Sequence, residues 1–400
     1  MQVLLLTDSY IPNKTSVARM IHELALELVR TGHKVTIVTS TRELAGPIDV
    51  EERDGIRICR VRAGKGDHVG RVTRAFAELA LPFMVWRHAR DEIAKATPDI
   101  VVSYSPTIFW GWLVGRIKSA HKCHAYLILR DIFPQWVVDI GLISKYNPAY
   151  WFFSAVEKLQ YWMADRIGVQ SPSNLNYFKQ YPRFESKTEI LWNWAADESP
   201  VPASPSYRER LGLIGKTVFF YGGNMGVAQR MDRLIRLADA FRANTAIHFV
   251  LVGEGSERDR LKREARQLGL QNIDILPAVA QDEFLCMLQE FDIGVVLLAP
   301  ELTTHNIPGK LISYAVAGKP ILADVNAGND VIELVHGHRA GLVSSNDESA
   351  LFLNAKMLAD GDDLRNELGA NAKALAGKLF SVRATAQQIV ALGFPRSSDK

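Results

Sequence analysis

Lys310 follows a Pro308-Gly309 break and opens a helical pattern. Its side chain is therefore expected in the first helical turn, where backbone N–H groups are unpaired and the helix dipole is positive. Such a helix start binds anions, and a lysine adds a point charge to it. Apolar runs at 293–299 and 321–325 flank the helix and are typical of buried parallel strands. The stretch predicts a phosphate-binding α/β unit, and the alternative is that Lys310 is an ordinary solvated lysine.

A second candidate phosphate site follows the predicted strand 217–221. There the turn Gly222-Gly223-Asn224-Met225-Gly226 precedes another helical pattern, and glycine lets a backbone approach a phosphate closely. Val252-Gly253-Glu254-Gly255 repeats the arrangement after the next predicted strand. Glycine turns of this kind also serve packing alone, so both interpretations stay open. The spacing is not the dinucleotide fingerprint, and we predict no nicotinamide cofactor.

Arg130 and Asp131 stand at the carboxyl end of a predicted strand, 125–129. Parallel sheets bind their ligands at these strand ends. Asp131 can orient or deprotonate a hydroxyl group, and Arg130 can bind a phosphate or a carboxylate. The alternative is an internal ion pair that caps the loop.

The first predicted strand, 3–6, begins almost at the first residue, which is not the pattern of a signal peptide. A predicted helix, 17–29, follows it and leads into a second strand. This βαβ order predicts a parallel sheet and places Lys14, Thr15 and Ser16 at its ligand-binding edge. For Ser16, however, a simple role as helix N-cap is the favoured interpretation.

Residues 195–206 are rich in proline, serine and acidic residues and have no periodicity, so they predict a domain boundary. The alternation of strands and helices restarts after them. We therefore expect an α/β protein with two Rossmann-like parallel-sheet domains, residues 1–195 and 207–379, facing each other across a cleft.

Aromatic and basic residues interleave in two predicted helices, 71–96 and 148–166. An exposed face of this composition suits an anionic membrane surface, because Trp and Tyr favour the interface. The alternative for the first helix is a core helix with a solvated basic side. Most aromatic residues of the second are expected in the core.

Composition sets the remaining limits. The 400 residues are 48% hydrophobic and 23% charged, as in a globular protein, and the net charge of +3 gives no reason to expect a nucleic-acid partner. Three well-separated cysteines suggest a reducing cytoplasm, and neither they nor the carboxylates form a metal-ligand pattern. No run is long and apolar enough to predict a membrane-spanning helix.

Taken together, several motifs resemble the GT-B glycosyltransferases of the large retaining family four. The resemblance covers nearly the whole chain and is strongest to the bacterial branch with N-acetyl-L-fucosamine transferases of the WbuB type. The motifs are RDIFP at 130–134, NW at 193–194, YGGNMGVAQ at 221–229, VGEG at 252–255 and IPGKLISYAVAGKP at 307–320.

The resemblance implies a nucleotide-sugar donor in the second domain, an acceptor in the first, and a tail helix within 380–400 that crosses back to the first domain. It implies donor phosphates near Gly222, Gly223 and Asn224, and the diphosphate on Lys310. It places Gly253, Glu254 and Val279 near the base. The remaining implied donor-binding positions are His305, Asn306, Ile307, Pro308, Ser313, Gln229 and Arg230.

Several positions depart from the family. His305 and Ser313 replace its glutamate pair, and Asn224 and Gln229 replace its Arg-Lys clamp. The resemblance nonetheless implies transfer with retention to a lipid-linked or saccharide acceptor, without metal, at the inner face of the cell membrane. A nucleotide-sugar epimerase and a non-catalytic scaffold that binds sugar or lipid remain as alternatives.

Overall fold

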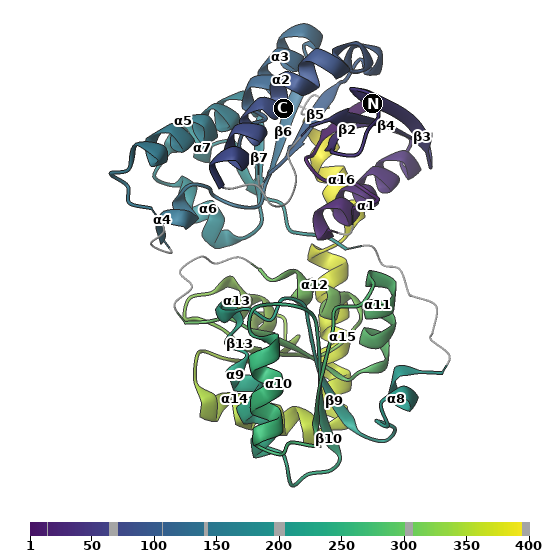
Figure 1. Ribbon diagram of the computed structural model, residues 1–400, viewed down its shortest axis with the longest axis vertical. Helices are drawn as coiled ribbons and strands as arrows, with labels where there is room; N and C mark the ends of the chain where they lie inside the picture. Colours follow the sequence, from purple (N-terminus) through teal and green to yellow (C-terminus); the bar gives the residue numbers. More distant parts are fainter. Residues whose placement is uncertain are drawn as a thin grey trace, which may run out of the picture. The chain divides into compact units, whose positions relative to one another are not determined.

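The computed structural model describes residues 1–13, 15–63, 71–105, 107–139, 143–195, 205–300 and 307–393. The chain divides into two units, each with one sheet (Figure 1). The first unit is Met1–Trp194 with Val382–Lys400, and the second is Ala195–Ser381. The last described α-helix thus belongs to the first unit.

The first unit has an eight-stranded sheet in the order β3-β4-β2-β1-β5-β6-β7-β8. Its neighbouring strands are parallel, except for the antiparallel pair β3–β4 at one edge. The strands are β1 (Gln2–Leu6), β2 (Lys34–Thr41), β3 (Ile48–Arg53), β4 (Ile56–Arg62), β5 (Ile100–Tyr104), β6 (His124–Leu129), β7 (Arg166–Val169) and β8 (Thr188–Ile190).

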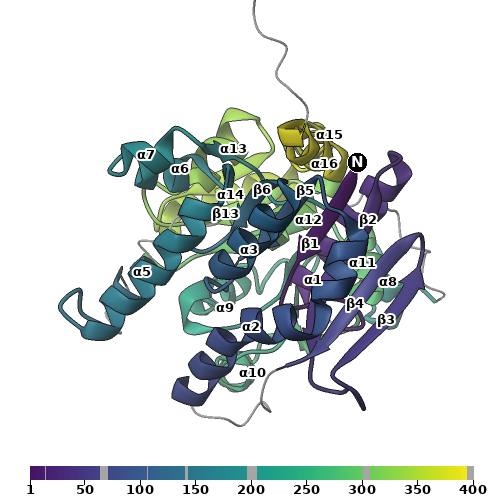
Figure 2. The ribbon, with the colours of Figure 1, turned by 90° about the horizontal axis from the view of Figure 1, so that it is seen from above.

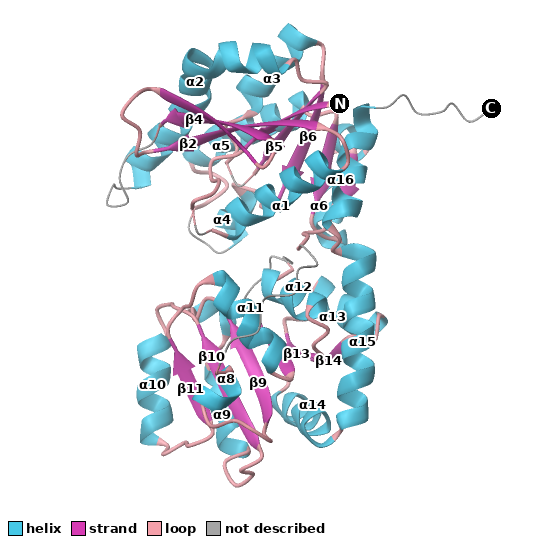
Figure 3. Ribbon diagram, turned by 90° about the vertical axis from the view of Figure 1, so that its right-hand side faces the viewer, coloured by secondary structure: helices cyan, strands magenta, loops and turns pink. Residues whose placement is uncertain are grey.

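Helices pack on both faces of this sheet because its strand residues alternate between two cores. In β1, Val3 and Leu5 join a core with α1 and α16, whereas Leu4 and Leu6 join one with α2 and α3. Figure 3 shows these helices around the strands. The helices are α1 (Ser16–Arg30), α2 (Arg71–Ala96), α3 (Gly111–His121), α4 (Gln135–Asp139), α5 (Pro148–Met163), α6 (Pro172–Phe178), α7 (Pro182–Glu185) and α16 (Val382–Val390).

The second unit has a six-stranded parallel sheet in the order β11-β10-β9-β12-β13-β14. The strands are β9 (Thr217–Gly222), β10 (Ile247–Val252), β11 (Ile273–Leu276), β12 (Ile293–Leu297), β13 (Ile321–Asp324) and β14 (Gly341–Ser344). The α-helices are α8 (Tyr207–Arg210), α9 (Asp232–Ala240), α10 (Arg258–Gln267), α11 (Gln281–Glu290), α12 (Gly309–Val316), α13 (Asp330–Gly337), α14 (Glu348–Asp360) and α15 (Asp362–Leu379). Two 3₁₀ turns, η1 (Val227–Gln229) and η2 (Ala391–Gly393), complete the described elements.

Neighbouring phenylalanines in β9 show how the second sheet is covered. Phe219 stacks on Phe249 and packs toward α9, whereas Phe220 faces Phe284 of α11 and Tyr314 of α12. The helix layers therefore follow directly from the alternation of side chains along a strand.

In each sheet the chain adds strands on one side of the first strand and then reverses to add strands on its other side. In the first unit the reversal lies between β1 and β5, and in the second it lies between β9 and β12. Ligands of open parallel sheets bind beyond the carboxyl ends of strands at this switch point. The candidate residues of the second unit, after β9 and at the start of α12, lie at such a point.

Two local predictions need correction. We expected purely parallel sheets and did not predict β3, which pairs with β4 in antiparallel direction. The residues of β3 are largely exposed and charged, so they lack the pattern of a core strand. The N-cap of α1 is Thr15 and not Ser16, since the Thr15 side chain accepts the Ala18 N–H at 3.2 Å.

Candidate functional site

Two loops of the second unit interlock through glycine. The loop after β9 donates from the Gly223 N–H to Val252 and from the Met225 N–H to Glu254, at 2.9 and 2.7 Å. A Cβ atom on Gly253 would lie 1.8 Å from the Gly223 oxygen. Gly253 therefore serves close packing of the two loops, whereas Gly223 is exposed at the carboxyl end of β9 and its role in phosphate binding stays a prediction.

Two buried tyrosines hold the first of these loops, and sequence reasoning missed their roles. The Tyr314 hydroxyl accepts the Gly222 N–H at 3.0 Å, and the Tyr221 hydroxyl donates to the Asn224 carbonyl at 2.6 Å. Both tyrosines are fully buried. Their places within the YGGNMGVAQ and IPGKLISYAVAGKP motifs were the available signal, but a buried tyrosine is ordinarily assigned to the core.

Lys310 stands in the first turn of α12, as predicted from the sequence, and the structure places it beside this loop. Its Nζ is 3.7 Å from the centroid of the Tyr221 ring, and a Cβ on Gly223 would lie 3.6 Å from its Cε. Burial lowers the pKa of Lys310 to about 7. Among the described residues no carboxylate or carbonyl accepts from Nζ, so this cation is available to an anion.

Asn224, Gln229 and Arg230 lie on the same loop. The Asn224 amide donates to Gln229 Oε1 at 3.2 Å, and the same oxygen accepts the Gly226 N–H. Arg230 has a left-handed backbone conformation and pairs with Asp232 at 3.4 Å. The amide pair thus closes the turn, and the Arg230 charge is partly balanced inside the protein.

Glu254 and the loop at 278–280, both expected near a base, are brought together. Glu254 Oε1 accepts the Ala278 N–H at 3.3 Å, and Oε2 pairs with Arg258. Val279 is half-buried between two exposed neighbours. Glu254 and the ends of the 278–280 loop are therefore exposed to solvent, whereas Gly253 is buried and tightly packed.

The remaining donor-binding candidates lie around the start of α12. Ile307 is buried, Pro308 is the N-cap residue, and the Ser313 hydroxyl lies 3.5 Å from the Gly309 carbonyl oxygen of its own helix. His305 and Asn306 lie outside the described residues.

Arg130, at the end of β6, has a different environment from the one expected of an anion-binding residue. Its Nη1 donates to the Leu191 carbonyl at 2.7 Å, and its guanidinium lies over the Trp194 ring at 5.2 Å. It is 7% exposed, and burial lowers its pKa below the ordinary value. These contacts show that Arg130 fastens the segment after β8, and its role in binding a substrate anion stays a prediction.

Asp131 is half-buried beside Arg130. Burial is the main cause that lowers the pKa of Arg130 and raises that of Tyr104, and the nearby Asp131 charge opposes the first shift and adds to the second. Asp131 therefore belongs to a buried polar cluster at the strand ends of the first unit.

Thr15 and Ser16, two acceptor candidates of the first unit, are exposed. Thr15 caps α1, and its hydroxyl lies 2.9 Å from Ser9 Oγ. Ser16 is exposed at the start of that helix, and Lys14 lies outside the described residues.

Within the described ranges, no three His, Cys, Asp or Glu side chains converge as metal ligands would. No helix in the same part of the chain has the length and apolar character needed to cross a bilayer.

Each unit matches a model of a glycosyltransferase family. Residues 15–194 match the "Glycosyl transferase 4-like domain", and residues 215–360 match "Glycosyl transferases group 1". With its two sheets and switch points, the protein has the two-domain GT-B fold. The chain is thus built from two glycosyltransferase-family domains.

Two bacterial proteins are similar over part of the chain. The probable glycosyltransferase WbjE of Pseudomonas aeruginosa is 24% identical over 52% of this chain and 53% of its own, so the match spans about half of that relative. The D-rhamnosyltransferase WbpZ of P. aeruginosa PAO1 is 26% identical over 78% of this chain and 77% of its own.

A solved structure extends the likeness in fold to the whole chain. The Anabaena protein Alr3699/HepE in complex with UDP-glucose has a TM-score of 0.64 and 16% identity. The match covers 97% of this chain and 98% of that one.

Proposed function

We propose that this protein transfers a sugar from a nucleoside diphosphate donor to an acceptor used in bacterial lipopolysaccharide, O-antigen or capsule assembly. The observation that carries the proposal is Lys310, a cation beside the exposed Gly223 backbone at the switch point of the second sheet. The similarity to WbpZ and the UDP-glucose complex of HepE support the same reaction class and donor type.

The chemistry proposed for Lys310 is stabilisation of the leaving group. When the glycosidic bond to the diphosphate breaks, negative charge develops on the phosphate oxygens. We propose that the Lys310 ammonium and the N–H groups at the start of α12 stabilise that charge, and their location beside the exposed loop after β9 supports this role. We infer that the acceptor attacks from the face of the leaving group, whose oxygen takes the acceptor proton, so that configuration is retained.

The finer features of the proposal are the donor, acceptor and location. We expect a UDP-sugar, such as an N-acetylated amino sugar, and a lipid-linked or saccharide acceptor. We further propose that no metal is needed and that the protein works at the inner face of the cell membrane. Asp131 is the proposed residue for orienting the acceptor hydroxyl.

Thermal unfolding with UDP, GDP, TDP or ADP, with and without magnesium, tests the donor site. A ligand at about 100 times its dissociation constant stabilises a protein by about 2.7 kcal/mol, enough to raise the melting temperature. We expect UDP to stabilise without magnesium. Stabilisation by none of the four would contradict the proposal, and tight binding of a UDP-sugar without transfer would favour the scaffold. Conversion of the UDP-sugar without acceptor would favour the epimerase.

A further inference from the structure

Helix α5 exposes apolar side chains and buries polar ones. Its buried face includes Ser154, Glu157 and Gln160, whereas a surface helix of a globular protein ordinarily exposes such polar residues to water. Trp151 is 64% exposed and Trp162 is 43% exposed. From residue 151 to the end of α5, no exposed residue is acidic. The exposed residues there are Trp151, Phe152, Ala155, Lys158, Leu159 and Trp162.

Packing against the rest of the first unit fixes this orientation. A Cβ on Gly111 of α3 would lie 2.8 Å from the backbone nitrogen of Gln160 in α5, so the two helices are in backbone contact. The Tyr161 hydroxyl donates to Glu157 at 2.5 Å, and burial raises the pKa of Glu157 to about 8. The helix therefore cannot turn its aromatic face inward without exposing this contact.

The orientation carries a cost in water. Both polar side-chain atoms of Gln160 are buried and have no hydrogen-bond partner in the described part of the protein. A buried polar group without a partner is destabilising, and large apolar groups outside gain nothing from burial. The exposed apolar side chains, unlike Gln160, become favourably buried when the outer face meets an environment that is itself partly apolar.

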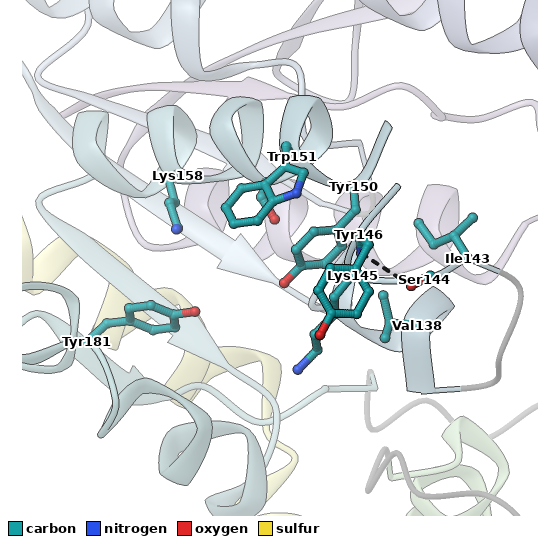
Figure 4. Close-up of a pocket in the computed structure, with 10 residues that line it drawn as sticks. Val138, Ile143, Ser144, Lys145, Tyr146, Tyr150, Trp151, Lys158 and Tyr181 are labelled. Atoms are coloured by element: carbon teal, nitrogen blue, oxygen red, sulfur yellow. Dashed lines mark hydrogen bonds between the residues drawn. The ribbon is translucent and has the colours of Figure 1, made fainter. Parts of the chain in front are cut away.

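A pocket of about 800 Å³ adjoins the same face (Figure 4). Trp151 and Lys158 of α5 line it, together with Lys145, Tyr146 and Tyr181. Figure 4 shows the two lysines approaching it from different sides. None of its described lining residues is acidic, so the pocket complements an anion.

Basic groups continue along the helix. Lys158 lies 5.5 Å from the centroid of the Tyr181 ring, and Arg183 lies 3.5 Å from that of Trp162. Aromatic side chains between basic ones suit the headgroup region of a membrane with anionic lipids. Figures 1 and 2 show α5 at the periphery of its unit.

We propose that the outer face of α5 docks on an anionic phospholipid bilayer. Trp151, Phe152, Leu159 and Trp162 enter the boundary between headgroups and acyl chains, and the pocket between Lys145 and Lys158 receives a lipid phosphate. This proposal rests on the membrane location in the proposed function and names the surface responsible.

Sedimentation of the full-length protein with phosphatidylcholine vesicles, with and without phosphatidylglycerol, tests the docking surface. We expect binding that requires phosphatidylglycerol and weakens at least about tenfold in Trp151→Ala/Trp162→Ala. Lys145→Glu/Lys158→Glu should weaken it at least about tenfold as well, because each basic group near an anionic surface contributes. The control is Leu353→Ala/Met357→Ala on α14, which removes two similarly exposed apolar side chains and should leave vesicle binding unchanged.

Unchanged vesicle binding in the tryptophan variant, or no binding by the parent protein, would overturn the proposal. So would binding that ignores phosphatidylglycerol, or a dimer in light scattering that the tryptophan substitutions abolish. Stabilisation by UDP is measured on the same variants and should match the parent. If α5-dependent vesicle binding persists while no nucleotide stabilises the protein, the proposed transferase function fails and the docking surface stands.

Discussion

Lys310 and Arg130 are both cations at the ligand-binding edge of a parallel sheet, yet their surroundings differ. Arg130 donates to the Leu191 carbonyl and lies over the Trp194 ring. Lys310 lies over the Tyr221 ring, and within the described residues its Nζ has no hydrogen-bond acceptor. Arg130 is therefore already used by the fold, whereas Lys310 can receive a ligand.

The difference shows that position at a strand end is not enough to assign a binding role. A planar guanidinium with several donors readily fastens a returning segment of chain, whereas an ammonium over an aromatic ring keeps donors free. The predictions test whether Lys310 acts in catalysis and Arg130 in the stability of the fold.

The largest effect is expected from Lys310→Ala. Loss of one group that stabilises transition-state charge typically lowers kcat by about 10²–10³-fold. We expect a loss of this size in multiple-turnover transfer, with the donor that the nucleotide screen identifies, and a melting temperature no lower than that of the parent. Lys356→Ala, which removes an exposed lysine of α14, is the control. Undiminished turnover in Lys310→Ala would remove Lys310 from the proposed mechanism.

Arg130→Met is expected to act on stability. The substitution leaves the Leu191 carbonyl without its donor, and a buried unpaired group costs about 1–3 kcal/mol. Urea unfolding should report a loss in this range while UDP binding stays unchanged. The exposed Arg87→Met on α2 should change stability by less than about 0.5 kcal/mol. A stable Arg130→Met protein with impaired transfer would instead support the predicted role of Arg130 in binding the substrate.

The smallest effect is expected from pH. The pKa of Lys310 is about 7, so its charged fraction, and with it UDP affinity, should fall as pH rises through 7. We expect a decrease of about three- to tenfold between roughly pH 6.5 and 8 in calorimetric titrations. Lys310→Arg keeps the charge throughout this range and should flatten the profile. The same decrease in Lys310→Arg would show that another group titrates.

The free protein should show the opposite trend in stability. Between pH 7 and the ordinary lysine pKa of 10.5, the unfolded chain holds a proton on Lys310 that the folded chain lacks. The contribution of this group to the free energy of unfolding therefore rises with pH in that window.

Much of the fold could be predicted from the sequence because both sheets are mainly parallel and buried on two faces. Nearly continuous apolar runs such as Ile247–Val252, interrupted only by His248, are strong signals, and this strand has the predicted bounds. The edge strand β3 gives no such signal, since all its residues except Ile48 are exposed. Local sequence therefore predicts buried strands better than exposed ones.

The part of the candidate site that follows from the course of the backbone could be predicted from the sequence. Gly223, Gly253 and Lys310 come together because strand ends of one sheet must meet at one edge. The use of Arg130 was not predictable, because its partner carbonyl lies 61 residues away along the chain. The outward turn of α5 was also unpredictable, since its sequence alone makes the aromatic residues look like core residues.

The placement of α16 has a consequence for how the protein is made. Ala386, Ile389 and Val390 complete the core formed by β1 and α1, although the entire second unit separates them from Trp194 in the chain. During synthesis, the first sheet therefore emerges from the ribosome long before the helix that covers part of it. Until translation has passed residue 390, that apolar surface stays open to solvent or to a chaperone, while the second unit can already close its own core.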